Sequence, residues 1–250
     1  MKQIAVIGAG TMGLGIAHVM AQHGLKVILI DLNEKILTES KKIISINIDR
    51  QIRKGVINEE QKKITLSNIL FTKKFNESIK NVELVVEAIH ENFNLKKKLI
   101  KDLDSMCKSD VIISSNTSSL SISNLADGTN YPDRFVGMHF MNPVPIMPLV
   151  EIVVGKNTSQ KTVDSIITLT KQINKTPLLV KDSPGFVSNR ILLPMINEAI
   201  ETLSQGVADV YSIDQIMKLG MGHPMGPLRL ADLIGPVSYT HLTLPTKRIV

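Results

Sequence analysis

The feature that most constrains the fold of this chain is a glycine-rich turn between a predicted strand and a predicted helix. The run QIAVIG (residues 3–8) is short, apolar and rich in β-branched residues, which is typical of a buried strand. Gly8, Gly10 and Gly13 then form the pattern G-x-G-x-x-G and open a segment whose apolar residues recur at helical spacing. The pattern alone is a weak signal. Because Asp31 ends the next predicted strand, about twenty residues after Gly10, the context predicts a dinucleotide-binding site.

Each part of this turn has a physical role at a pyrophosphate. The first glycine makes the tight turn, the second lets the backbone approach the phosphates, and the third lets helix and strand pack closely. The helix N-terminus adds N–H groups and a partial positive charge. The residues expected to bind the cofactor here are Gly8, Ala9, Gly10, Thr11, Met12 and Gly13. Asp31 can accept from both ribose hydroxyls and would repel a 2′-phosphate, so NAD is expected rather than NADP.

Predicted strands alternate with predicted helices through the first 183 residues. Further strands are expected at residues 26–31, 82–89, 110–116, 134–140, 149–155 and 177–182. Helices are expected at about 33–63 with an interruption near Gly55, at 94–106 and at about 159–174. This alternation predicts the α/β class, with a mostly parallel sheet covered by helices on both faces.

The pattern becomes wholly helical near residue 183. Ser183 is a favourable N-cap and Pro184 a favourable first helical residue, so a helix is expected to begin there. Pro194 is expected to kink this helix. The chain is therefore predicted to contain an NAD-binding domain at residues 1–183 and a smaller helical domain at residues 184–235.

Residues 236–250, PVSYTHLTLPTKRIV, depart from the helical pattern. They show no helical periodicity, and Pro236 and Pro245 interrupt the segment. We expect this tail to be atypical and foreign to the native end, which leaves the helical domain incomplete. Apolar side chains of the helical domain would then have fewer partners than intended, among them Ile191, Leu192, Met195, Ile196 and Leu203.

Composition narrows the possible partners and compartment. The chain has 250 residues, 43% of them hydrophobic, and a net charge of +6. Its three tyrosines and six phenylalanines do not interleave with a basic stripe, so a phosphorylated small molecule fits this charge better than nucleic acid. Scattered histidines and a single cysteine, Cys107, argue against a metal site and an internal disulfide. With no signal peptide and no apolar stretch long enough to span a bilayer, a cytoplasmic location is expected.

One histidine lies inside an almost wholly apolar run, GMHFMNPVPIMPLVE (residues 137–151). An isolated His139 would usually be a satisfied core residue. Beside a nicotinamide cofactor, however, a histidine at the carboxyl end of a strand can take the proton of an alcohol while hydride leaves. Glu151 is expected on the neighbouring strand, where its carboxylate would stabilise the imidazolium and fix the tautomer. The pair predicts an oxidoreductase.

Six segments, in this order, resemble the L-3-hydroxyacyl-CoA dehydrogenase family: GAGTMGLGIA, VVEAIHEN, SSNTSSL, HFMNPVP, LVEIV and KDSPGFVSNR. The resemblance covers about residues 1–235. It implies a Rossmann domain followed by a helical domain that completes the substrate cleft and the homo-oligomer. It also implies NAD-dependent interconversion of (S)-3-hydroxyacyl-CoA and 3-oxoacyl-CoA in fatty acid or butanoate metabolism, with 3-hydroxybutyryl-CoA as the expected short-chain substrate.

The resemblance assigns roles to four catalytic positions. His139 and Glu151 correspond to the catalytic pair. Ser118 corresponds to the serine that holds the substrate 3-oxygen and contacts the nicotinamide ribose. Asn189 corresponds to an asparagine that holds the substrate from the helical side.

The resemblance also implies further binding residues that the local pattern does not indicate. Glu91, Lys96 and Asn142 correspond to cofactor-binding positions, and Lys54 to a position that contacts coenzyme A phosphate. By charge alone, Glu91 and Lys96 would be a solvated helix start and Lys54 a solvent-exposed side chain. Asn142 alone would be a turn residue before Pro143.

Three other functions remain open from the residues themselves. Ser118, His139 and Glu151 could form a hydrolase triad, but no G-x-S-x-G elbow surrounds the serine. A hydroxyacid dehydrogenase acting on a free acid would normally use a catalytic lysine rather than a histidine. A dinucleotide-binding protein left catalytically weak by an incomplete helical domain is the third possibility, and assays with NADH separate it from an enzyme.

Overall fold

The computed structural model describes residues 1–235 of the chain, and residues 236–250, the predicted atypical tail, lie outside the described part. The chain divides into two units between Asp182 and Ser183.

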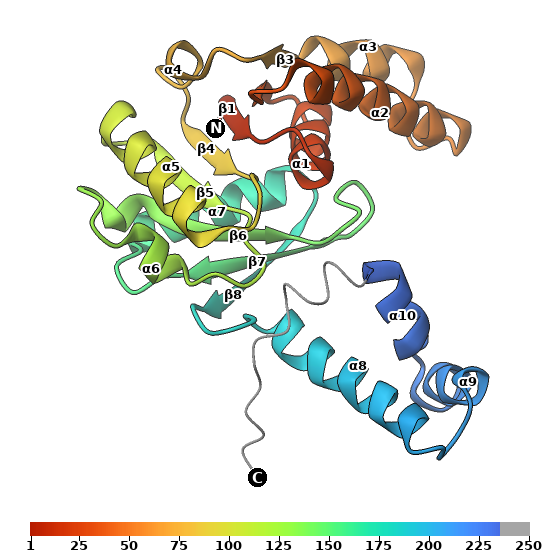
Figure 1. Ribbon diagram of the computed structural model, residues 1–250. Coiled ribbons are helices and arrows are strands. Elements are labelled where there is room, and N and C mark those ends of the chain that lie inside the picture. The colour runs from red at the N-terminus through yellow and green to blue at the C-terminus, as the bar shows by residue number, and fades with distance from the viewer. Residues whose placement is uncertain (236–250) are drawn as a thin grey trace. The chain divides into compact units, whose positions relative to one another are not determined.

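The first unit is built on one eight-stranded sheet with the order β3-β2-β1-β4-β5-β6-β7-β8 (Figure 1). The strands are β1 (Gln3–Ile7), β2 (Lys26–Ile30), β3 (Ile69–Thr72), β4 (Leu84–Glu87), β5 (Ile112–Ser115), β6 (Phe135–Phe140), β7 (Leu149–Val154) and β8 (Thr176–Lys181). Neighbouring strands are parallel except β6 and β7, which are joined by a short turn and run antiparallel. The predicted mostly parallel sheet is confirmed, although β3 was not expected.

Helices cover both faces of this sheet. They are α1 (Thr11–Gln22), α2 (Glu34–Arg53), α3 (Glu59–Ser67), α4 (Phe75–Ser78), α5 (Phe93–Met106), α6 (Ile122–Ala126) and α7 (Gln160–Gln172), with a 3₁₀ turn at Pro132–Arg134. Met138 of β6 belongs to the core cluster that includes residues of α1, α2 and α7. A Cβ on the preceding residue, Gly137, would meet the Ile122 side chain of α6 at 2.9 Å. Because successive strand residues point to opposite faces, α6 lies on the face opposite α1.

The strand core follows the same alternation. Ile4 and Val6 of β1 and Val86 of β4 are fully buried in the cluster with α1. Ala5, between them, is also fully buried, on the other face. Burial of both faces explains why the strands of this unit are nearly continuous apolar runs. Polar side chains that interrupt these runs therefore require a specific partner.

The second unit contains three described helices, α8 (Ser188–Ser204), α9 (Val210–Met221) and α10 (Pro227–Ile234). The prediction that a helix begins at Ser183 and Pro184 is wrong, because α8 begins at Ser188. Gly185 and Phe186 have φ values of 73° and 51°, and left-handed residues cannot continue a right-handed helix. Pro194 lies inside α8, and the helix continues past it to Ser204.

Candidate active site

The glycine turn joins β1 to α1 and is shaped by close backbone packing. Gly8 has φ 97°, and a Cβ there would lie 2.5 Å from the Ala88 carbonyl oxygen. A Cβ on Gly13 would lie 1.7 Å from the Gly8 carbonyl oxygen, so only glycine allows α1 to approach the turn this closely. At Gly10, the N-cap of α1, a Cβ would meet nothing within 4 Å, and no side chain caps the helix. The space over the helix N-terminus therefore suits a bound phosphate.

Asp31 lies directly after β2 and contacts this turn. Its Oδ2 accepts a hydrogen bond from the Ala9 N–H at 2.9 Å, and its Oδ1 accepts from the Asn33 N–H at 2.9 Å. Ser40 of α2 donates to the Ala9 carbonyl oxygen at 2.6 Å. Both the N–H and the carbonyl oxygen of Ala9 are thus hydrogen-bonded, and the Asp31 carboxylate is held beside the glycine turn.

His139 and Glu151 face each other across the antiparallel pair β6–β7. The register places them directly opposite, and His139 Nδ1 lies 2.7 Å from Glu151 Oε2. Both residues are buried, 7% and 3% exposed. With Nδ1–H donated to the carboxylate, the basic lone pair of the imidazole is on Nε2. The predicted pairing of the two side chains is confirmed.

The turn between these two strands is fastened to the rest of the unit by a residue that the sequence analysis missed. Lys175, after α7, donates from Nζ to the carbonyl oxygens of Val144 and Met147, both at 2.7 Å. Burial lowers the pKa of Lys175. Val144 also packs on α1, because a Cβ on Gly15 would lie 2.9 Å from the Val144 Cβ. The turn that follows His139 is therefore anchored at both α1 and the start of β8.

Glu91 and Ser118 come together at the carboxyl end of the sheet. Glu91 Oε1 accepts the Ser118 N–H at 3.0 Å and lies within reach of the Ser118 and Ser119 hydroxyls at 3.3 and 3.2 Å. Burial alone would raise the pKa of the Glu91 carboxyl. The Lys96 ammonium and hydrogen bonds from Thr117 and Ser118 outweigh burial and keep that pKa below its usual range. Glu91 is thus an ionised acceptor that organises the turn carrying Ser118.

Lys96 is a buried residue and not part of a solvated helix start. It is 1% exposed, and its ammonium lies 2.6 Å from Glu87 Oε1 and 3.2 Å from Glu91 Oε2. Glu87, at the end of β4, was missed by the sequence analysis and is 0% exposed. The signal was present, because an acid at the end of the apolar run VELVVEAI needs a buried partner.

The other three predicted site residues, Asn142, Lys54 and Asn189, lie in three separate segments of the chain. Asn142 is exposed in the turn between β6 and β7, directly before Pro143. Lys54 is the exposed C-cap of α2, so its local environment shows only a solvated side chain. Asn189 belongs to the second unit, in the first turn of α8, and is 8% exposed. A further residue, Asn116, was missed: its Oδ1 accepts the Phe140 N–H at 3.0 Å, next to His139.

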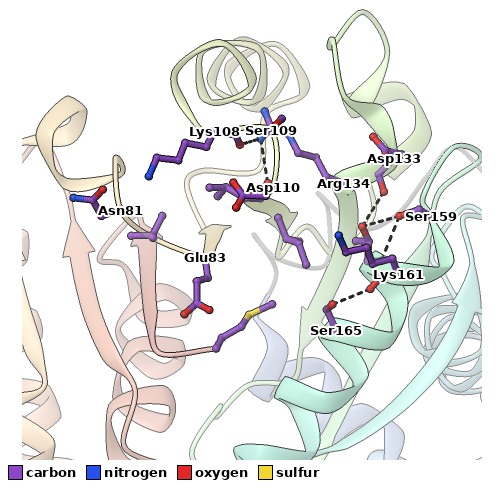
Figure 2. A pocket seen from close by; sticks show the side chains of 15 residues that line it. Asn81, Glu83, Lys108, Ser109, Asp110, Asp133, Arg134, Ser159, Lys161 and Ser165 are labelled. Atoms are coloured by element: carbon purple, nitrogen blue, oxygen red, sulfur yellow. Dashed lines mark hydrogen bonds between the residues drawn. The ribbon is translucent and has the colours of Figure 1, made fainter.

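The first unit also has a polar cavity of about 510 Å³, but it lies at the opposite edge of the sheet. Figure 2 shows Glu83, Lys108, Asp133 and Lys161 around it. Its lining residues include those that precede β4, β5 and β6, so it opens at the amino ends of these strands. Open α/β sheets bind their ligands beyond the carboxyl ends of the strands, where His139, Glu91 and the glycine turn lie.

Within residues 1–235, no helix has both the length and the apolar character needed to cross a bilayer. Over the same range, no three histidine, cysteine or acidic side chains converge in a way that could hold a metal ion.

Comparison with known proteins relates this geometry to one family. Residues 3–183 match the model of the 3-hydroxyacyl-CoA dehydrogenase NAD-binding domain, and residues 185–243 match that of its C-terminal domain. The 3-hydroxybutyryl-CoA dehydrogenase of Clostridioides difficile is 46% identical over 233 residues, covering 93% of this chain and 83% of that protein. A probable 3-hydroxybutyryl-CoA dehydrogenase of Bacillus subtilis is 46% identical over 235 residues, 94% of this chain and 82% of that protein. The crystal structure of (S)-3-hydroxybutyryl-CoA dehydrogenase from Ralstonia eutropha superposes with a TM-score of 0.93 at 44% identity, covering 97% of this chain and 85% of that one.

Proposed function

Because the chain belongs to the 3-hydroxyacyl-CoA dehydrogenase family, we propose that it interconverts (S)-3-hydroxyacyl-CoA and 3-oxoacyl-CoA with NAD as cofactor. The observation that carries this proposal is the buried His139–Glu151 pair, whose 2.7 Å contact lies at the same edge of the sheet as the glycine turn. The names of the similar proteins favour a four-carbon substrate, 3-hydroxybutyryl-CoA.

The pair supplies the acid–base part of the reaction. In the oxidative direction the 3-hydroxyl gives its proton to His139 Nε2, and the imidazolium that forms is stabilised by the Glu151 carboxylate. In the reductive direction the same imidazolium returns the proton to the 3-oxygen. Ser118 is assigned to hold that oxygen, and Asn189 to hold the substrate from the helical unit.

The residues around the glycine turn fit a dinucleotide. The uncapped N-terminus of α1 and the open space at Gly10 suit the pyrophosphate, and Asp31 suits the ribose hydroxyls of NAD. Glu91, with Lys96 behind it, and Asn142 are assigned to the same cofactor. When bound, NAD supplies the hydride acceptor. Lys54 is assigned to a phosphate of coenzyme A.

The wider organisation is proposed on the same basis. Residues 1–183 form the NAD-binding domain, and residues 184–235 form the helical domain. The protein acts in the cytoplasm, in fatty acid or butanoate metabolism, and its native family form is a homo-oligomer.

The test is NADH oxidation with 3-oxoacyl-CoA substrates of increasing chain length, starting from acetoacetyl-CoA. We expect oxidation that is fastest with the four-carbon substrate and much slower when NADPH replaces NADH, because Asp31 repels a 2′-phosphate. Tight NADH binding without oxidation of any of these substrates would contradict the proposal. That result would favour a dinucleotide-binding protein without useful catalysis.

A further inference from the structure

Glu87 has no role in the proton transfer, yet its carboxylate is buried two strands away from the proposed base, His139. Glu87 ends β4 and is 0% exposed. In the sheet register, Glu87 pairs with Ser115 and Ser115 pairs with Gly137. His139 lies two residues beyond Gly137 on β6, and therefore on the same face of the sheet. The Glu87 side chain thus shares a face of the sheet with the proposed base, two strands away and level with the residue two positions before it.

One oxygen of this carboxylate is bound to Lys96. Lys96 Nζ donates to Glu87 Oε1 at 2.6 Å and to the Ile89 carbonyl oxygen at 3.1 Å, and it pairs with Glu91 Oε2 at 3.2 Å. These three acceptors match the three N–H groups of an ammonium. In this arrangement the protein itself occupies the whole donor capacity of Lys96. Its influence on a ligand therefore passes through Glu91, the acceptor nearest the proposed site.

The other oxygen of Glu87 leads to the same place by a second route. The Ser115 hydroxyl donates to Glu87 Oε2 at 2.5 Å and accepts the Thr117 N–H at 3.2 Å. The Thr117 hydroxyl donates in turn to Glu91 Oε1 at 2.5 Å. Glu87, Lys96, Glu91, Thr117 and Ser115 therefore form a closed ring of hydrogen bonds. Glu87 is the member that receives a bond from each arm.

We propose that Glu87 is a positioning residue, which fixes the turn at residues 117–119 and the carboxylate of Glu91 in their cofactor-binding arrangement. The proposal rests on the proposed function, because the binding roles of Glu91 and Ser118 belong to it. Charge supports the same assignment. The cluster pairs one buried ammonium with two carboxylates, so loss of the Glu87 charge leaves Glu91 as the only ionised partner of Lys96 and draws it away from the turn.

The test is the Glu87→Gln variant, which keeps the size of the side chain and removes its charge. The amide nitrogen cannot accept a hydrogen bond, so only one arm of the ring keeps its acceptor. We expect the dissociation constant of NADH, from fluorescence titration, to rise on the order of tenfold, as for loss of a charged hydrogen-bonding partner. An NADH dissociation constant within about twofold of the parent in a folded variant would overturn the proposal.

A double-variant cycle separates positioning from general structural damage. If Glu87 acts through Glu91, the variant carrying both Glu87→Gln and Glu91→Gln should bind NADH no more weakly than Glu91→Gln alone. Independent, multiplicative losses would overturn the proposal. Because NADH titration needs no acyl-CoA, absence of acyl-CoA turnover in the parent would contradict the proposed function and still leave this test intact.

Asp104 provides a matched control on the same helix as Lys96. It is 4% exposed and pairs with Arg134 at 2.9 Å, near the amino ends of the strands. Asp104→Asn also replaces a buried carboxylate by an amide. It should lower the melting temperature of the first unit and leave the NADH dissociation constant unchanged. An equal loss of NADH affinity in this control would overturn the assignment to Glu87.

If Glu87→Gln does not fold, Ser115→Ala tests the second arm of the ring alone. This variant removes the hydroxyl that joins Glu87 to the Thr117 N–H and leaves the Glu87–Lys96 pair in place, so the NADH dissociation constant should rise by only about threefold to fivefold. An unchanged value in Ser115→Ala would then overturn the proposal.

Discussion

The two units of the chain differ in how completely they bury their apolar residues. In the first unit, one core cluster joins seven strands to α1, α2 and α7. In the described part of the second unit, the corresponding cluster consists of Ala199, Ile213 and Leu228. Ile216, Leu219 and other apolar side chains of its helices are more than half exposed. A sheet can bury both faces at once, whereas three helices leave apolar stripes that need further partners.

The helical unit also retains an apolar hollow of about 360 Å³, lined in part by Met195, Ile213 and Met217. The expectation of under-packed apolar faces holds for Ile191, which is 66% exposed, but it is wrong for Ile196, which is fully buried. The contrast teaches that the proposed acid–base pair belongs to a densely packed scaffold. Asn189 belongs to a sparsely packed one.

The largest expected effect concerns the dense unit. His139→Gln removes the basic nitrogen and keeps a side chain of similar size, so kcat should fall roughly a thousandfold or more. The NADH dissociation constant should stay within about twofold, because the imidazole is not assigned to the cofactor. Steady-state kinetics and fluorescence titration measure the two quantities. Equal loss of turnover and NADH binding would count against the proton-transfer role.

The packing contrast itself can be tested with two core truncations. Leu29→Ala opens a cavity in a fully buried strand of the first unit and should cost about 3 kcal/mol of unfolding free energy. Ile213→Ala affects the small helical core, which has fewer partners to lose, and should cost about 1–2 kcal/mol. Hydrogen exchange resolved by segment measures each unit separately. Similar costs in both units would remove the proposed difference.

The buried His18 of α1 should make the stability of the first unit depend on pH. The side chain is completely buried, at 0% exposure, and neither ring nitrogen is within hydrogen-bonding geometry of a partner. Burial lowers its pKa from 6.5 to about 4, and the neighbouring Gln22 side chain offsets only part of that shift. Between these pH values the unfolded chain binds a proton that the folded chain does not. Stability should therefore fall as the pH drops from 6.5 to 4, by up to about 3 kcal/mol.

Urea unfolding at several pH values checks this expectation. His18→Leu should remove most of the loss between pH 6.5 and 4, because it removes the group that titrates. His23→Gln, at the partly exposed end of the same helix, should leave the loss in place. An unchanged pH profile in the His18→Leu variant would contradict the assignment to this residue.

The smallest effect is expected on the exposed side of the helical unit. Leu219 is 82% exposed, so Leu219→Lys should change the unfolding free energy by less than about 0.5 kcal/mol. The same change should reduce self-association, because it places a charge on an apolar surface. Sedimentation and thermal unfolding measure the two effects. A large loss of stability would show that Leu219 is covered in solution, which would weaken the contrast between the units.

Features that depend on local spacing could be predicted from the order of residues along the chain. The glycine turn and Asp31 followed from one short pattern and its distance from the next strand, and the mostly parallel sheet followed from alternating apolar runs. His139 and Glu151 could be paired in advance because a short turn joins their strands and brings them into register. Periodicity and short connections are local properties, so they can be recognised without coordinates.

Which charged residues are buried, and what they contact, depends on the packing of distant segments against one another. Lys96 has the local pattern of a solvated helix start, yet it lies 1% exposed between Glu87 and Glu91. Lys175 contacts a turn about thirty residues earlier, and Ser115 closes a ring with Glu87 on the neighbouring strand. Such contacts join distant segments through the order of strands in the sheet, which the spacing of residues along the chain does not encode.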